Sequence, residues 1–231
     1  MNNQVKYPRC LVGCPTFNGK EYCLDKFIKS IKNLTYPNYD ILIVDTTNPA
    51  HGGEFKKKIT DHGIEVISHY NTPQFVNVYE GRNIIRKRVL EGGYDYYMSI
   101  ESDHVVPVDI IERLLANKKK VVGGWYMSRN RNNKSILNLV PPWLDRKEPD
   151  FYDKEEVIKV FSMGLGDVLI HRSVLEKVKF RWEEYTFEGT DIKAGWWDDI
   201  WFYIDLEKRG ISAWCDKRIY VEHIIDEEVT L

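Results

Sequence analysis

Short apolar runs alternate with segments of helical periodicity along the first half of the chain. The apolar runs, which are typical of buried strands, lie at residues 10–14, 40–45, 65–68, 96–100 and 121–125. The helical segments lie at residues 22–34, 54–62, 80–91 and 109–118. Strands that alternate with helices predict right-handed βαβ units, and continuously apolar strands predict a sheet covered on both faces. The expected fold class is therefore α/β, with a mainly parallel, Rossmann-like sheet flanked by helices.

The second half of the chain has a different pattern. Residues 128–153 are polar, rich in proline and low in periodicity, which indicates a long excursion over the surface. Residues 181–197 are expected to be irregular. The strands and helices expected around them lie at 157–163, 167–170, 173–178 (helix), 199–209 (helix), 212–216 and 218–222. The length of 231 residues suits a single domain.

Composition narrows the class of protein. A hydrophobic fraction of 43% and a net charge of −2 are those of a globular protein and argue against a dedicated nucleic-acid partner. No apolar run has the length of a membrane span, and the first residues lack an apolar signal region, so we expect a cytoplasmic protein. The four cysteines are too few and too scattered for a disulfide framework, and Cys10 and Cys14 are expected in the core. The aromatic content of 13% is compatible with sugar rings as ligands.

Polar side chains follow three of the expected strands. Ligands of open α/β sheets bind beyond the carboxyl ends of the strands, so these side chains should converge on one edge. They are Thr16, Asn18, Asp45, Glu101, Ser102 and Asp103.

The strongest signal is the pair of carboxylates at Glu101 and Asp103. Two acids in one tight turn repel each other unless a cation neutralises them, and carboxylate oxygens suit a hard divalent ion. The alternative is a polar turn in which Asp103 bonds the local backbone, because aspartate favours turns.

This acid-x-acid turn resembles the D-x-D motif of GT-A-fold glycosyltransferases. Further segments resemble motifs of that family in the same order, and together they span about residues 8–225. They are CPTFN at 14–18, IVDTTN at 43–48, GRNIIRKRV at 81–89, VVGGWY at 121–126, GLGDVLIHRSVLEKV at 164–178, WWDDIWFYIDLEKRG at 196–210 and IYVEH at 219–223. The sequence looks most like the compact, family-two-like inverting enzymes, although Glu101 replaces the first aspartate and Asp198-Asp199 replaces a Glu-Asp pair.

The resemblance implies a donor site for a nucleoside-diphosphate sugar such as a UDP or GDP sugar. Asp103 would bind a divalent cation, Glu101 would lie near the ribose or contact a water on the metal, and His223 would be the third protein contact of the metal site. An imidazole ligand suits Mn²⁺ better than Mg²⁺. The alternative for His223 is an ordinary histidine at a strand end. The residues implied to bind the nucleotide sugar are Pro15, Thr16, Asn18, Asp45, Arg82, Asn83, Glu101 and Ser102. Arg82 and Asn83 are expected to open a helix, whose N-terminus favours anions.

The resemblance also implies an acceptor site. Asp199 is the candidate general base, which would take a proton from the acceptor hydroxyl, and Asp198 would contact acceptor hydroxyls. Either acid is also a favoured helix N-cap. Trp125, Trp196 and Trp197 are candidate platforms for the acceptor, with burial in the core as the alternative. Residues 8–127 would then form the donor half, and residues 128–225 the acceptor half, which would take a glycan, glycoprotein or glycolipid.

Other functions remain open from the sequence. Within enzymes, the alternatives are a retaining hexosyltransferase and a sugar-phosphate nucleotidyltransferase. The latter calls for a basic, glycine-rich loop after the first strand, and residues 14–22 hold one glycine and one lysine. A carbohydrate-binding protein without catalysis is the alternative from a different class. The sequence carries no signal for an oligomeric state.

Overall fold

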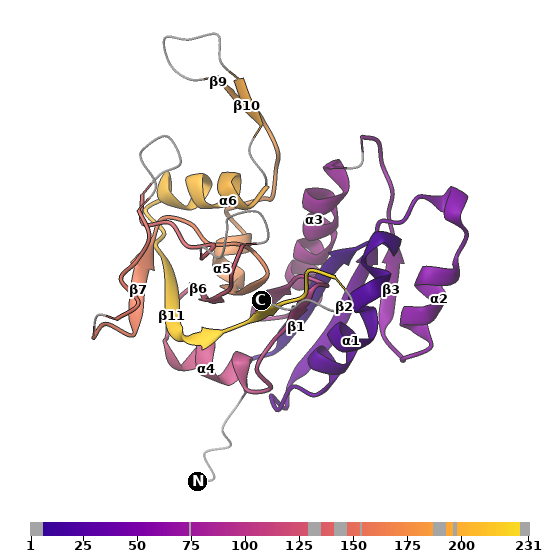
Figure 1. Cartoon of the computed structure of the whole chain (residues 1–231), viewed down its shortest axis with the longest axis horizontal. Coiled ribbons are helices and arrows are strands. Elements are labelled where there is room, and N and C mark those ends of the chain that lie inside the picture. The colour runs from indigo at the N-terminus through magenta and orange to yellow at the C-terminus, as the bar shows by residue number, and fades with distance from the viewer. Residues whose placement is uncertain are drawn as a thin grey trace.

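A mixed eight-stranded sheet forms the centre of the molecule (Figure 1). The computed structural model describes residues 7–73, 75–128, 135–140, 147–152, 154–186, 193–195 and 198–226. The strand order in the sheet is β3-β2-β1-β4-β8-β6-β11-β7. The strands of the sheet are β1 (Cys10–Thr16), β2 (Tyr39–Asp45), β3 (Glu65–Ser68), β4 (Tyr96–Ile100), β6 (Val121–Trp125), β7 (Val157–Val160), β8 (Asp167–His171) and β11 (Ala213–Tyr220).

The first half of the chain gives the parallel part of the sheet. β1 pairs in parallel with β2 and β4, and β2 with β3, so the carboxyl ends of these four strands lie at one edge. β8 enters between β4 and β6 and is antiparallel to both, and β7 is antiparallel to β11. The expected α/β class with a mainly parallel sheet is confirmed.

Helices cover both faces of the sheet, because alternate strand residues point to opposite sides. In β1, Val12 packs in the core with α1 (Leu24–Lys32), α2 (Glu54–Thr60) and α4 (Ile110–Ala116). Leu11 packs in the other core with α3 (Val76–Glu91), α5 (Arg172–Leu175) and α6 (Asp198–Glu207). Two short 3₁₀ helices, η1 (Asn18–Cys23) and η2 (Pro49–His51), follow β1 and β2. All four cysteines are buried and free, which confirms the expected burial of Cys10 and Cys14.

α3 begins at Val76 and not near residue 80, so the expected start was wrong. Residues 76–79 look extended because valine and tyrosine favour strands. The buried side chain of Asn77 instead fixes the first turn, since it accepts from the Asn71 N–H (2.6 Å) and donates to the Asn71 carbonyl (3.0 Å). Arg82 and Asn83 therefore lie inside the helix and do not open it.

α3 packs unusually close to β1. A Cβ at Gly13 would lie 2.5 Å from Ile85, and one at Gly81 would lie 2.7 Å from the Pro15 side chain. Glycine at both positions lets the two backbones approach. Arg82 is thereby brought to the carboxyl end of the sheet.

Two further expectations about the second half were wrong. Within the segment expected to be irregular, β9 (Glu184–Thr186) and β10 (Lys193–Gly195) form an antiparallel pair that extends beyond α6 (Figure 1). These two strands have three residues each, which is too few to show an alternation of apolar and polar side chains in the sequence. The two strands expected at 212–216 and 218–222 are one strand, β11. The break comes later, where β12 (Glu222–His223) leaves the sheet to pair with β5 (His104–Val105). Among the described helices, none combines the length and apolar content that crossing a bilayer requires.

Candidate functional site

A cavity of about 170 Å³ lies at the carboxyl ends of β1 and β4. It is lined by Pro15, Thr16, Phe17, Lys20, Thr46, Val78, Arg82, Glu101, Ser102 and Asp103. The Thr16 hydroxyl donates to the Ser102 hydroxyl at 2.8 Å and joins the ends of the two strands. Most of the side chains expected at this edge therefore surround one space.

Three of the predicted donor-site residues do not line this cavity. Asp45 accepts from the Thr47 N–H at 2.9 Å, and the Asn18 N–H donates to the Thr47 hydroxyl at 2.9 Å, so both support the turn beside Thr46. The Asn83 side-chain amide donates to the Phe180 carbonyl at 2.7 Å and accepts from the Phe180 N–H at 3.1 Å. Their roles in binding a nucleotide sugar stay predictions.

Arg82 is the most deeply buried cation of the site. Its side chain is 2% exposed, and it donates from Nη1 to Asp198 Oδ2 at 3.0 Å and from Nη2 to Glu101 Oε1 at 2.9 Å. The expectation that Arg82 lies at a helix N-terminus was wrong, because α3 starts six residues earlier, and its role in binding the nucleotide sugar stays a prediction. Arg82 instead links the turn after β4 to the first turn of α6.

Asp198 and Asp199 open α6 and differ in their partners. Asp198 is 6% exposed and paired with Arg82. Asp199 is half-buried, and its described hydrogen bond comes from the N–H of Ile200 at 2.7 Å. Burial, followed by the charge of Asp198, raises the pKa of Asp199 to about 7. Asp199 thus has the pKa of a group that can exchange a proton near neutral pH.

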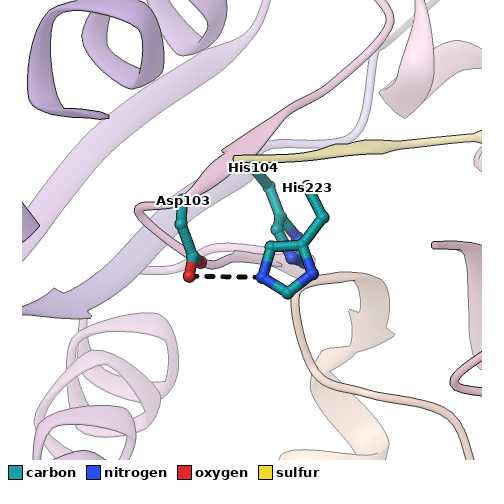
Figure 2. Close-up of side chains that lie close together, drawn as sticks. All are labelled: Asp103, His104 and His223. Atoms are coloured by element: carbon teal, nitrogen blue, oxygen red, sulfur yellow. Dashed lines mark hydrogen bonds and ion pairs between the residues drawn. The ribbon is translucent and has the colours of Figure 1, made fainter. Parts of the chain in front are cut away.

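β5 and β12 bring Asp103, His104 and His223 together, although the third residue is 119 positions from the second in the chain. His223 Nε2 lies 3.3 Å from Asp103 Oδ2, and His223 Nδ1 lies 2.9 Å from the Met127 carbonyl (Figure 2). One ligand atom from each of the three residues lies within 4.8 Å of the others, and all three residues are buried. A carboxylate and two imidazoles are a donor set that fits a divalent transition-metal ion.

The charge of this cluster is set by its neighbours. Burial opposes ionisation of Asp103, but the hydrogen bond with His223 and the Lys20 ammonium group outweigh it and hold its pKa well below the usual range. Lys20 Nζ lies 2.5 Å from Asp103 Oδ2. Burial pulls the pKa of His223 down, yet the bonds to Asp103 and Met127 give a net rise. Asp103 is therefore ionised in this cluster, and its carboxylate already binds one cationic side chain, that of Lys20.

Three residues near this site were not predicted from the sequence. Two of them are Lys20, which follows β1, and His104, which directly follows Asp103. Asp167, at the start of β8, is fully buried, and neither of its carboxylate oxygens has a hydrogen-bond partner. Burial and the charge of Glu101 raise the pKa of Asp167 to about 8. The one available signal was the position of Asp167 directly after Gly164–Gly166, at the start of an expected strand. That this strand, β8, pairs with β4 and so brings Asp167 near the site is visible in the structure alone.

The predicted acceptor platform is described only in part. Trp125 donates from Nε1 to the Lys217 carbonyl at 2.8 Å, and its ring packs on Phe151 and Tyr220 with centroids 4.4 and 4.9 Å away. The structure does not bring Trp125 to the cavity. Trp196 and Trp197 lie outside the described residues.

Comparisons of the sequence and of the fold give different results. No protein-family model matches the chain, and no curated protein sequence matches it significantly. The fold, in contrast, is similar to that in the crystal structure of GalNAc-T7 with UDP, GalNAc and Mn²⁺, with a TM-score of 0.67 and 15% identity over 97% of this chain and 45% of that one.

The crystal structure of S. aureus TarS 1-349 is also similar, with a TM-score of 0.57 and 12% identity over 96% of this chain and 59% of that one. The same protein in complex with UDP-GlcNAc gives a TM-score of 0.56 and 12% identity, over 96% of this chain and 57% of that one. The chain spans about half the length of these solved structures. At such low identity the likeness concerns the fold alone, and this chain has the GT-A fold.

Proposed function

We propose that this chain, which has the GT-A fold, is a metal-dependent glycosyltransferase that moves a hexosyl group from a nucleoside-diphosphate sugar to an acceptor hydroxyl. One observation carries the proposal. The buried Asp103–His223 pair and the Glu101–Arg82–Asp198 network meet at one cavity, at the edge where open α/β sheets bind ligands. The similar folds solved with UDP and Mn²⁺ or with UDP-GlcNAc support a UDP sugar as the first donor to test, before a GDP sugar.

Asp103 and His223 are the residues that would hold the divalent cation, with Glu101 close by. A nitrogen ligand favours Mn²⁺ over Mg²⁺, which prefers oxygen. When bound, the cation would offset the negative charge that develops on the diphosphate leaving group. Lys20 would have to move from Asp103 to admit it, and its ammonium group would then be available to a phosphate oxygen.

Asp199 is the proposed general base, and the pairing of the two acids supports this choice over Asp198. Arg82 forms an ion pair with Asp198 and fixes its position, although burial outweighs this pairing and raises the pKa of Asp198 as well. Asp199 has no described ion pair, which favours it as the acceptor of the proton from the acceptor hydroxyl. A pKa of about 7 makes Asp199 a stronger base than an ordinary carboxylate while it is still ionised in much of the protein at neutral pH. A base on the acceptor side supports a single displacement with inversion.

We assign the donor to residues 8–127 and the acceptor to residues 128–225, with a glycan, glycoprotein or glycolipid as acceptor. The cavity supports the first assignment, since all its lining residues lie before residue 104. Trp125, Trp196 and Trp197 remain the proposed acceptor contacts.

A screen of UDP and GDP sugars, scored by release of the nucleoside diphosphate in the presence of Mn²⁺, tests the proposal. We expect release from at least one donor, strictly dependent on the metal, and NMR analysis of the product should show an inverted anomeric centre. A product with the donor's configuration would favour the retaining alternative. Glycan binding without release from any donor would favour a non-catalytic carbohydrate-binding protein.

A further inference from the structure

His104 has the geometry of a metal ligand, and the contact described for its Nε2 is a long one, 3.9 Å to Glu101 Oε2. The residue is fully buried, and Nε2 has no hydrogen-bond partner. A buried polar atom without a partner is costly and calls for an explanation. The other nitrogen, Nδ1, lies 3.0 Å from the Gly166 carbonyl, which can only accept. Nδ1 therefore carries the proton, and the lone pair is on Nε2, as in a metal-binding imidazole.

The pairing of β5 with β12 places the side chains of His104 and His223 next to each other. The two residues are directly opposite each other in the antiparallel pair, so their side chains leave the same face. Their ring centroids lie 5.0 Å apart. Figure 2 shows both imidazoles and the Asp103 carboxylate on the same side of the two strands. Two donors from the paired strands and one from the turn before β5 are thus arranged around one space.

The segment Gly164–Gly166 makes room for this arrangement. A Cβ at Gly166 would lie 2.1 Å from Cε1 of His104, and a Cβ at Gly164 would lie 1.7 Å from the Tyr126 hydroxyl oxygen. The Tyr126 ring in turn packs edge-on against His104, with centroids 4.2 Å apart. The ring of His104 is thus held between Gly166 and Tyr126, which restricts the direction of its Nε2.

We propose that His104 is, through Nε2, a third protein ligand of the cation that Asp103 and His223 hold, so that this chain binds the cation before any nucleotide arrives. The inference rests on the metal site of the proposed function and adds a ligand to it. With one carboxylate and one imidazole, the diphosphate would have to complete the site. With a second imidazole, the protein alone supplies three ligands.

The test is Mn²⁺ binding by the whole chain without nucleotide, followed by calorimetry and by pulsed electron paramagnetic resonance, which detects the nitrogens of coordinated imidazoles. We expect one bound Mn²⁺ with two coordinated imidazoles in the wild type. His104→Gln should show one imidazole and bind Mn²⁺ at least about tenfold more weakly. His62→Gln, which alters an exposed histidine, is the matched control and should behave as the wild type.

The spectrum of the wild type keeps the test valid even where His104→Gln folds poorly. A single coordinated imidazole in the wild type, or no Mn²⁺ binding until UDP is added, would overturn the proposal. The two proposals also fail separately. Mn²⁺ held by two imidazoles in a chain that binds neither UDP nor GDP supports the His104 ligand and contradicts the glycosyltransferase. If UDP binding requires Mn²⁺ but the spectrum shows a single coordinated imidazole, the glycosyltransferase proposal is supported and the His104 ligand is contradicted.

Discussion

The two ends of the parallel strands carry arginine–carboxylate pairs in opposite environments. At the amino ends, Arg9 pairs with Asp40 at 2.9 Å and Arg88 with Glu65 at 2.6 Å, and all four side chains are 34–52% exposed. At the carboxyl ends, Arg82 is 2% exposed and binds both Glu101 and Asp198. The larger cavity, of about 710 Å³, lies at the amino ends, and the smaller one, of about 170 Å³, at the carboxyl ends.

This difference shows that burial of charge, and not cavity size, distinguishes the candidate site. Exposed pairs are screened by water and contribute little to stability. Buried charges are costly to desolvate, and their pairing often does no more than offset that cost. A fold that keeps Arg82, Asp103 and Asp198 buried at one edge retains them at an energetic disadvantage, which supports a role in binding or catalysis.

The largest expected effect at the carboxyl edge is the loss of the general base. Asp199→Asn should lower the rate of sugar transfer by about 10²–10⁴-fold, because the amide cannot accept the proton of the acceptor hydroxyl. Donor binding, measured by calorimetry, should stay as in the wild type.

The pH profile of the wild type is the companion measurement. Because the pKa of Asp199 is raised to about 7, the rate should fall as the pH drops below 7 and level off above it. Transfer by Asp199→Asn at the wild-type rate would remove Asp199 from the mechanism.

The next effect is on stability. Arg82→Gln leaves the buried Asp198 without its cation, and removing one partner of a buried pair costs about 3–5 kcal/mol of unfolding free energy. Urea denaturation measures this loss. A loss of unfolding free energy no larger than that for an exposed ion pair, under about 1 kcal/mol, would contradict the difference in charge burial between the two edges of the sheet.

Local pattern predicted the central strands well and the site only in part. β3, β4 and β6 have the expected bounds, and for β4 the reason is clear, because its residues lie between the acidic Asp95 and Glu101. The start of α3 depends on the contact of Asn77 with Asn71, and the position of β8 depends on pairing with strands far away in the chain. No local pattern encodes either contact.

The same limit applies to the site residues. Asp103 was predicted from its neighbour Glu101, and His223 from the resemblance to a family. The pairing of β5 with β12, which sets His104 opposite His223, depends on two-residue strands too short to predict.

A smaller effect is expected at Asp167, the buried carboxyl group without a partner. Its pKa is raised to about 8 in the folded protein, against about 3.9 unfolded, so the folded state holds the proton more tightly and stability falls as the pH rises between these values. Asp167→Asn removes this loss. Its melting temperature should therefore exceed that of the wild type by several degrees at pH 8 and by less at pH 5. A difference independent of pH would contradict the raised pKa.

The smallest effect is expected at the amino edge. Arg88→Gln breaks a bidentate but partly exposed pair with Glu65 and should cost under about 1 kcal/mol. Urea denaturation beside Arg82→Gln gives the comparison directly. Sugar transfer should be unchanged, and a loss of transfer would show that the amino edge also takes part in function.

Titration of UDP into the protein with and without Mn²⁺, repeated on Asp103→Asn, tests the central claim most directly. We predict that Mn²⁺ tightens UDP binding by at least about tenfold in the wild type, because cation and diphosphate share the corner at Asp103, and that Asp103→Asn loses this gain. Equal affinity for UDP with and without Mn²⁺, or an undiminished gain in Asp103→Asn, would contradict the claim.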